Sequence, residues 1–91
     1  NEALKTSEKM LQLDDKIQEN TQLARQYLAE LDREEPGMFQ AYLEVLLDNC
    51  DTLADDLDVF EQEGLNIGSL DSHYQQLADR VEELQTRLEG I

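Results

Sequence analysis

The residues with the clearest chemical pattern in this chain are carboxylates. Five acidic side chains follow one another at steps of four and three, in a stretch without any lysine or arginine: Glu44, Asp48, Asp51, Asp55 and Asp58. These steps place residues on one face of a helix, so the five are expected to form an acidic ridge about 21 Å long. Like charges at this spacing repel one another, so the ridge suits a basic partner. A solvated face of a generally acidic protein is the alternative interpretation.

The same stretch does not match a calcium loop. Such a loop needs oxygen ligands at alternate positions, a glycine at its sharp turn and a bidentate glutamate at its end. Counted from Asp56, the glycine position holds Glu61 and the last position holds Ile67. We therefore expect no metal site and no cofactor.

Histidine and cysteine, two side chains common in catalysis, occur once each. His73 has no carboxylate, cysteine or second histidine three or four positions away, so it is expected on the surface or at the rim. Cys50 falls at an apolar helix position, which predicts a buried and unreactive thiol. The chain has no phosphate-binding loop and no nucleophile elbow. We expect no catalytic residues and no enzymatic activity.

Three apolar heptad runs define the elements that carry these residues. Each run alternates steps of three and four, the period of a helix face packed on other helices. The breaks between runs fall at Pro36-Gly37 and at Gly64–Gly68. The spacing predicts helices over about 2–34, 38–63 and 69–89, hence an all-α, antiparallel three-helix bundle with coiled-coil-like packing. The runs are Ala3, Thr6, Met10, Leu13, Ile17, Asn20, Ala24, Tyr27, Leu31; Phe39, Leu43, Leu46, Cys50, Leu53, Leu57, Phe60; and Leu70, Tyr74, Leu77, Val81, Leu84, Leu88, Ile91.

Pairing the helices outward from the two short connections predicts the layers of the core. Tyr27 is expected opposite Leu46, and Asn20 opposite Leu53. Asn20 is a polar residue at an apolar seam position. It either fixes the alignment of the helices or is tolerated at the bundle edge, where it bonds water.

The predicted helices have unequal lengths. The first exceeds its partners, so roughly nine residues at its start are expected to lack cover from this chain. Ala3, Thr6 and Met10 lie on this overhang and are candidate partner-binding residues. A neighbouring repeat or a second copy of the chain could cover them.

Composition limits the classes of partner. The net charge of −15 over 91 residues excludes nucleic acid or an anionic membrane as the main partner. The sequence shows no signal peptide and no run of 18 apolar residues, which predicts no membrane insertion. We expect one domain over residues 1–91, cut from a longer protein because the chain starts without Met, and a cytoplasmic location.

The segment Leu77-Ala78-Asp79-Arg80-Val81-Glu82-Glu83-Leu84 resembles the last helix of a spectrin repeat, in its spacing of leucines and arginine. The whole chain is similar in plan, with three long acidic heptad helices, although the tryptophans usual in that family are absent. The resemblance implies an elongated spacer or docking domain in a cytoskeletal or nuclear-envelope scaffold.

These observations favour a non-catalytic structural and interaction module of a larger cytoskeletal or scaffold protein, with other proteins as partners. An adaptor bundle of membrane traffic is the first alternative. It would bind a partner helix in an apolar groove, expected near Leu47, Ala54 and Val59. A self-associating coiled coil, in which the first helix pairs with its copy, is the second.

Overall fold

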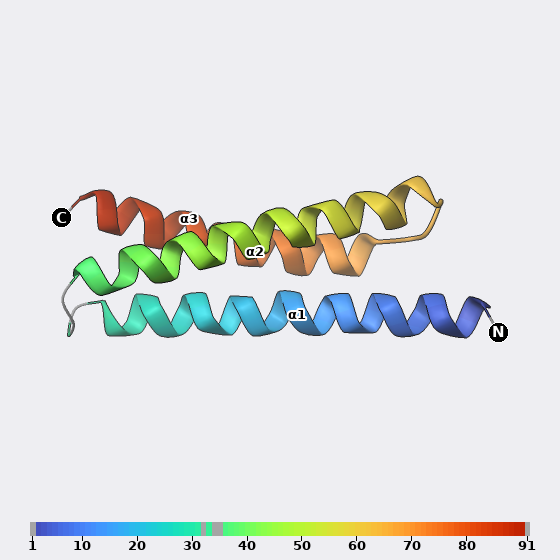
Figure 1. The fold of residues 1–91 in the computed structure, drawn as a ribbon, viewed down its shortest axis with the longest axis horizontal. Helices are drawn as coiled ribbons and strands as arrows, with labels where there is room; N and C mark the ends of the chain where they lie inside the picture. Colours follow the sequence, from blue (N-terminus) through green and yellow to red (C-terminus); the bar gives the residue numbers. More distant parts are fainter. Residues whose placement is uncertain (1, 32, 34–35, 91) are drawn as a thin grey trace.

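Three long helices make up almost all of the described chain. The computed structural model describes the backbone of residues 2–31, 33 and 36–90, and the side chains of these residues except 2, 3 and 36. The helices are α1 (Glu2–Glu30), α2 (Pro36–Gln62) and α3 (Gly68–Glu89). They pack side by side as a bundle of 49 × 18 × 17 Å, with neighbours in the chain antiparallel (Figure 1). The predicted all-α three-helix bundle is confirmed.

The core follows the predicted heptad positions. Leucines dominate it, and Ile17, Leu77 and Leu84 are fully buried. The only buried polar side chain among the described residues is Thr21, whose hydroxyl donates to the carbonyl of Ile17 at 2.8 Å. The buried apolar residues are Leu13, Ile17, Ala24, Leu31, Phe39, Leu43, Leu46, Cys50, Leu53, Leu57, Leu70, Leu77, Val81, Leu84 and Leu88.

The end of α2 is set by Gly64, as the sequence indicates. Gly64 has a φ of +81°, a conformation that glycine adopts at little cost. Its N–H donates to the carbonyl of Glu61, and the N–H of Leu65 donates to that of Phe60. This pair of bonds is the Schellman arrangement, which satisfies carbonyls left free at a helix end.

The start of α3 differs from the prediction. The helix was expected from about residue 69, but α3 begins one residue earlier, at Gly68, and Ser69 is its second residue. Ile67 occupies the N-cap position without a side-chain cap bond, and the side-chain oxygen of Asn66, one residue earlier, accepts the N–H of Gly68 at 3.1 Å. Asp71 lies in the first turn, near the positive end of the helix dipole, where its negative charge is stabilising.

The first connection also differs. The α1 helix ends at Glu30 instead of Glu34, and α2 begins at Pro36 instead of Met38. Proline suits a first helical position because its fixed φ is helical and its missing N–H has no partner there anyway. The predicted helical residues 32 and 34 lie outside the described part of the chain. Both helix boundaries are therefore earlier in the sequence than predicted.

This change shifts α2 along α1 by about one helical turn. Tyr27 stacks on Tyr42, with ring centroids 4.8 Å apart, and Asn20 bonds Asn49. The predicted neighbours, Leu46 and Leu53, each lie about four positions later in α2, which is about one turn. The predicted alignment of α1 with α2 was therefore wrong, because it assumed the later turn.

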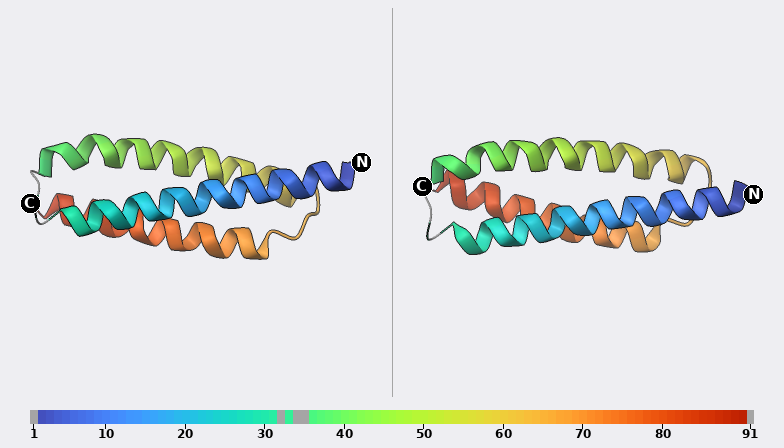
Figure 2. Two further views of the ribbon diagram at one scale, coloured as in Figure 1. Left: turned by 90° about the horizontal axis from the view of Figure 1, so that it is seen from below. Right: turned by 60° about the horizontal axis from the view of Figure 1, so that its bottom comes forward.

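The shift extends α2 toward the start of α1. Met10 packs against the core and Thr6 is half-buried, so these two residues do not form a bare overhang. The side chain of Ala3 lies outside the described residues. The start of α1 does extend past the start of α3, so this end of the bundle is built from α1, α2 and the second connection (Figure 2).

Candidate docking groove

One of the three helix–helix contacts is open to solvent. The contact between α1 and α2 is less extensive than those of α3 with either helix. On the side away from α3, α1 and α2 border a groove of about 560 Å³. We call this line of contact the α1–α2 seam. The residues lining the groove are Lys5, Thr6, Lys9, Gln12, Leu13 and Lys16 from α1, and Asp56, Val59, Phe60 and Glu63 from α2 and the residue that follows it.

The α1 side of the groove is basic. Lys5, Lys9 and Lys16 lie on one ridge of α1, and all three are exposed. None of them forms an ion pair with a described side chain. Three of the seven basic residues of a strongly acidic chain therefore gather on one border of the groove.

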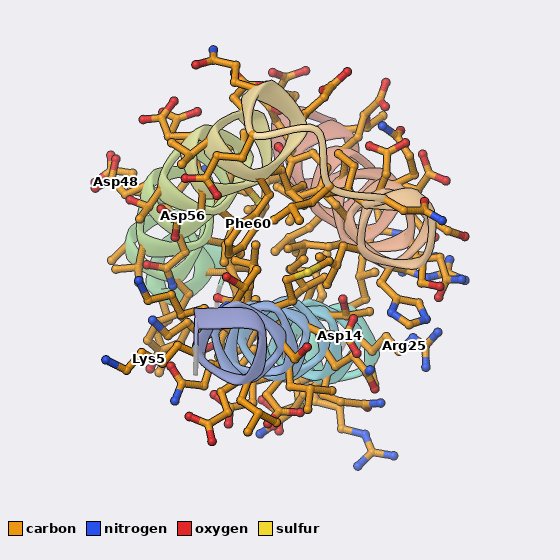
Figure 3. All side chains as sticks on the ribbon, turned by 90° about the vertical axis from the view of Figure 1, so that its right-hand side faces the viewer. Lys5, Asp14, Arg25, Asp48, Asp56 and Phe60 are labelled. Atoms are coloured by element: carbon orange, nitrogen blue, oxygen red, sulfur yellow. The ribbon has the colours of Figure 1, made fainter. Side chains whose placement is uncertain are left out.

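The α2 side of the groove is acidic. Asp56 and Glu63 line it, seven positions apart on the same face of the chain, and both are exposed. Figure 3 shows Asp56 and Asp48 on the same side of the bundle as Lys5. The groove is thus bordered by cations on α1 and by anions on α2.

The floor of the groove is apolar. Leu13 is buried and Phe60 is half-buried, with its ring directed between the two helices (Figure 3). Val59 is 52% exposed although it is a large β-branched side chain. Val59 and Phe60 together place apolar surface in the concave part of this contact, where an apolar side chain of a partner can be received.

The seam continues beyond the groove toward the first connection. Asn49 bonds Asn20 across it at 2.8 Å, and Tyr42 then stacks on Tyr27. Met38 and Val45 flank Tyr42 on α2 at steps of four and three, and both are about half exposed. The seam is therefore a long surface with apolar residues at both ends and a polar pair between them.

The five residues of the predicted acidic ridge are all exposed on α2. None of them lines the groove, whose acidic border is formed by other carboxylates. Of the other candidate partner-binding residues, Met10 packs against the core and half-buried Thr6 lines the groove.

The apolar groove expected near Leu47, Ala54 and Val59 is present only in part. Val59 lines the observed groove, whereas Leu47 and Ala54 do not. Leu47 and Ala54 are seven positions apart and share a face of α2, but Val59 follows Ala54 by five positions, which turns it to another face. The alignment error described above also concealed the opposing residues of α1.

A second, smaller pocket of about 140 Å³ lies between α1 and α3. It is lined by polar side chains, including Arg25, His73 and Gln76. Nδ1 of His73 is 2.5 Å from Oδ1 of Asp14, on the other helix. The sequence placed no carboxylate beside His73 because this partner is distant in the chain. Among the described residues, no group of three or more His, Cys, Asp or Glu side chains could hold a metal ion.

Cys50 is buried, as predicted, and burial raises the pKa of its thiol, with a smaller contribution from the Asp51 carboxylate. Tyr74 donates its hydroxyl to the Cys50 carbonyl at 3.4 Å. Burial also raises the pKa of the Tyr74 hydroxyl, and Cys50 and Asp51 add to the effect. Both groups therefore stay neutral at neutral pH.

Comparisons of the chain with models of protein families, with curated proteins and with solved structures found no match. None of the helices in the described part of the chain is long and apolar enough to cross a membrane. The geometry of the bundle is therefore the basis for a functional proposal.

Proposed function

We propose that this bundle is a non-catalytic docking module that binds a partner protein along the α1–α2 seam. The observation that carries this proposal is the groove itself, with an exposed valine and a half-buried phenylalanine between two helices. Closing such a groove with apolar side chains would remove these residues from water, which contributes about 25 cal/mol for each Å² of apolar surface.

The shape of the bundle supports a place in a larger scaffold or cytoskeletal protein. The start of α1 and the end of α3 lie at opposite ends of the long axis (Figure 1). A bundle with this geometry can act as a rod-like spacer between neighbouring parts of a longer chain while its side binds a partner. The spectrin-repeat resemblance of residues 77–84 agrees with that role, and a cytoplasmic location would fit it.

The proposal is tested by placing a charge in the groove. The full-length protein that contains this bundle is isolated from its own cells with its partners, as the natural sequence and with Val59→Glu. The matched control is Leu11→Glu on α1, because Leu11 is an exposed apolar residue, 65% accessible, that lies outside the groove.

We expect Val59→Glu to lose a partner protein that the natural sequence and Leu11→Glu retain. Circular dichroism and urea unfolding confirm that all three proteins are folded. Retention of every partner by Val59→Glu would overturn the proposal.

A further inference from the structure

We propose that the groove receives an amphipathic helix whose two flanks carry opposite charges, acidic toward α1 and basic toward α2. This inference rests on the proposed docking function and specifies the chemistry of the partner. It follows from the shape of the groove, its apolar floor and the division of charge between its borders.

The shape of the groove suits a helix. Its basic border, from Lys5 to Lys16, follows α1 for about 17 Å, and its acidic border follows the end of α2. A groove between two helices accepts a third helix, as the opposite side of α1 and α2 accepts α3 in this bundle. Helix binding in such grooves relies on apolar residues at steps of three and four, which would cover Val59 and Phe60.

The charges of the borders define the flanks of that helix. Lys5, Lys9 and Lys16 are unpaired with any described side chain, as are Asp56 and Glu63. A helix with acidic residues toward α1 and basic residues toward α2 would give all five charges an opposite partner. A uniformly acidic helix would instead meet repulsion from the α2 border and from the net charge of −15, and a uniformly basic helix would meet the three lysines.

The division of charge also fixes the direction of the bound helix. A helix that lies with its apolar face in a groove can run either way along it, and reversing the helix exchanges its flanks. Only one direction then places acidic residues beside the α1 lysines. The charges therefore select direction as well as affinity.

The inference is tested with three synthetic helical peptides of about 18 residues, all with the same composition and the same apolar stripe. The first has divided flanks, the second has the two flanks exchanged, and the third has both charges mixed evenly on each flank. Fluorescence anisotropy at low salt gives the affinity of each peptide for the folded bundle. A nitroxide at the peptide N-terminus broadens NMR signals nearby and reports which way the peptide runs.

We expect the first two peptides to bind equally but in opposite directions, so that the nitroxide broadens signals near Glu63 with one and near Asn49 with the other. The mixed peptide should bind about tenfold more weakly, since several exposed pairs each contribute a few tenths of a kcal/mol. Equal affinity of all three peptides, or one direction for both divided peptides, would overturn the division of charge.

Absence of binding by all three peptides would overturn the helix as occupant. The docking function would still stand in that case if Val59→Glu lost its partner protein and Leu11→Glu kept it. A variant with Lys5, Lys9 and Lys16 all replaced by Glu adds an internal control. This triple variant should bind the mixed peptide no better than the natural bundle does. It should no longer hold the two divided peptides in opposite directions.

Discussion

Asn49 on α2 donates its side-chain amide to Oδ1 of Asn20 on α1 at 2.8 Å, across the α1–α2 seam. The amide of Asn20 in turn donates to the carbonyl of Lys16, also at 2.8 Å. Both side chains are half-buried. If the two helices moved apart or slid along one another, water would replace the lost bond only in part. This hydrogen bond forms only when the two asparagines lie at the same height along the bundle axis. It therefore fixes the position of α2 along α1.

The asparagine pair should be measurable as a coupling. Asn20→Ala and Asn49→Ala are each expected to lower the free energy of unfolding by about 1 kcal/mol, because each leaves the other amide without its partner. The double variant should lose clearly less than the two single losses added together. Urea unfolding of the four proteins gives the values, and strictly additive losses would show that the bond contributes nothing.

The aromatic contact between α1 and α2 tests their alignment independently. Stacked rings such as Tyr27 and Tyr42 are worth about 0.5–1.5 kcal/mol beyond the surface they bury, so a double-mutant cycle with alanine should give a coupling in this range. The control cycle combines Tyr42 with Tyr74, whose hydroxyl bonds the Cys50 carbonyl elsewhere in the bundle. The control pair should be additive, and a coupling of equal size in both cycles would contradict the observed alignment.

The stability of the hydrophobic core should depend on Leu77, which is fully buried, and not on Leu11, which is 65% exposed. Leu77→Ala removes buried methyl groups and leaves a cavity, so it should cost about 2–5 kcal/mol of stability. Leu11→Ala makes the same chemical change on the surface and should alter stability by about 0.5 kcal/mol or less. Thermal unfolding of both variants measures the difference, and similar losses would be inconsistent with these two placements.

Stability should decline at alkaline pH through Cys50 and Tyr74. Their pKa values are raised on folding, above the ordinary values of 9.0 and 10.0, so the folded chain holds these protons more tightly than the unfolded chain. Their contribution is complete below the unfolded pKa values and is lost as the pH rises through the folded ones. The combined variant Cys50→Ala and Tyr74→Phe should therefore lose less stability than the natural sequence between about pH 8 and pH 10.5.

Urea midpoints at several pH values measure this difference. Asp51→Asn serves as the control for the smaller cause, and it should reduce the alkaline loss without removing it. If the natural sequence and the combined variant lost the same stability over this pH range, burial of Cys50 and Tyr74 would not be the source of the alkaline loss.

The heptad pattern predicted the number of helices, the core residues and the second connection, because apolar periodicity and the Gly64 helix end are local properties of the sequence. The alignment of α2 was not predictable in the same way. Pro36 disfavours helix at the residue before it and favours helix from itself onward, and a small difference in where the turn is placed moves every layer by about one turn.

The candidate site depended on that alignment. The sequence indicated Val59 as an exposed apolar residue but gave no reason to place it beside Lys9 of α1. The contact of His73 with Asp14 was not predictable from local spacing, since it joins α3 to α1 instead of neighbours in one helix. By contrast, the acidic ridge of α2 was predictable because all of its members share one helix face.

The most direct test of the account is to photocrosslink the bound partner from positions on different seams of the bundle. A photoreactive amino acid replaces Val59 in the groove between α1 and α2, or Gln76, which lines the smaller pocket between α1 and α3. In the full-length protein in its own cells, the partner lost in Val59→Glu should crosslink at position 59 and not at position 76. Crosslinking of that partner from position 76 alone would contradict the assignment of the α1–α2 seam as the docking surface.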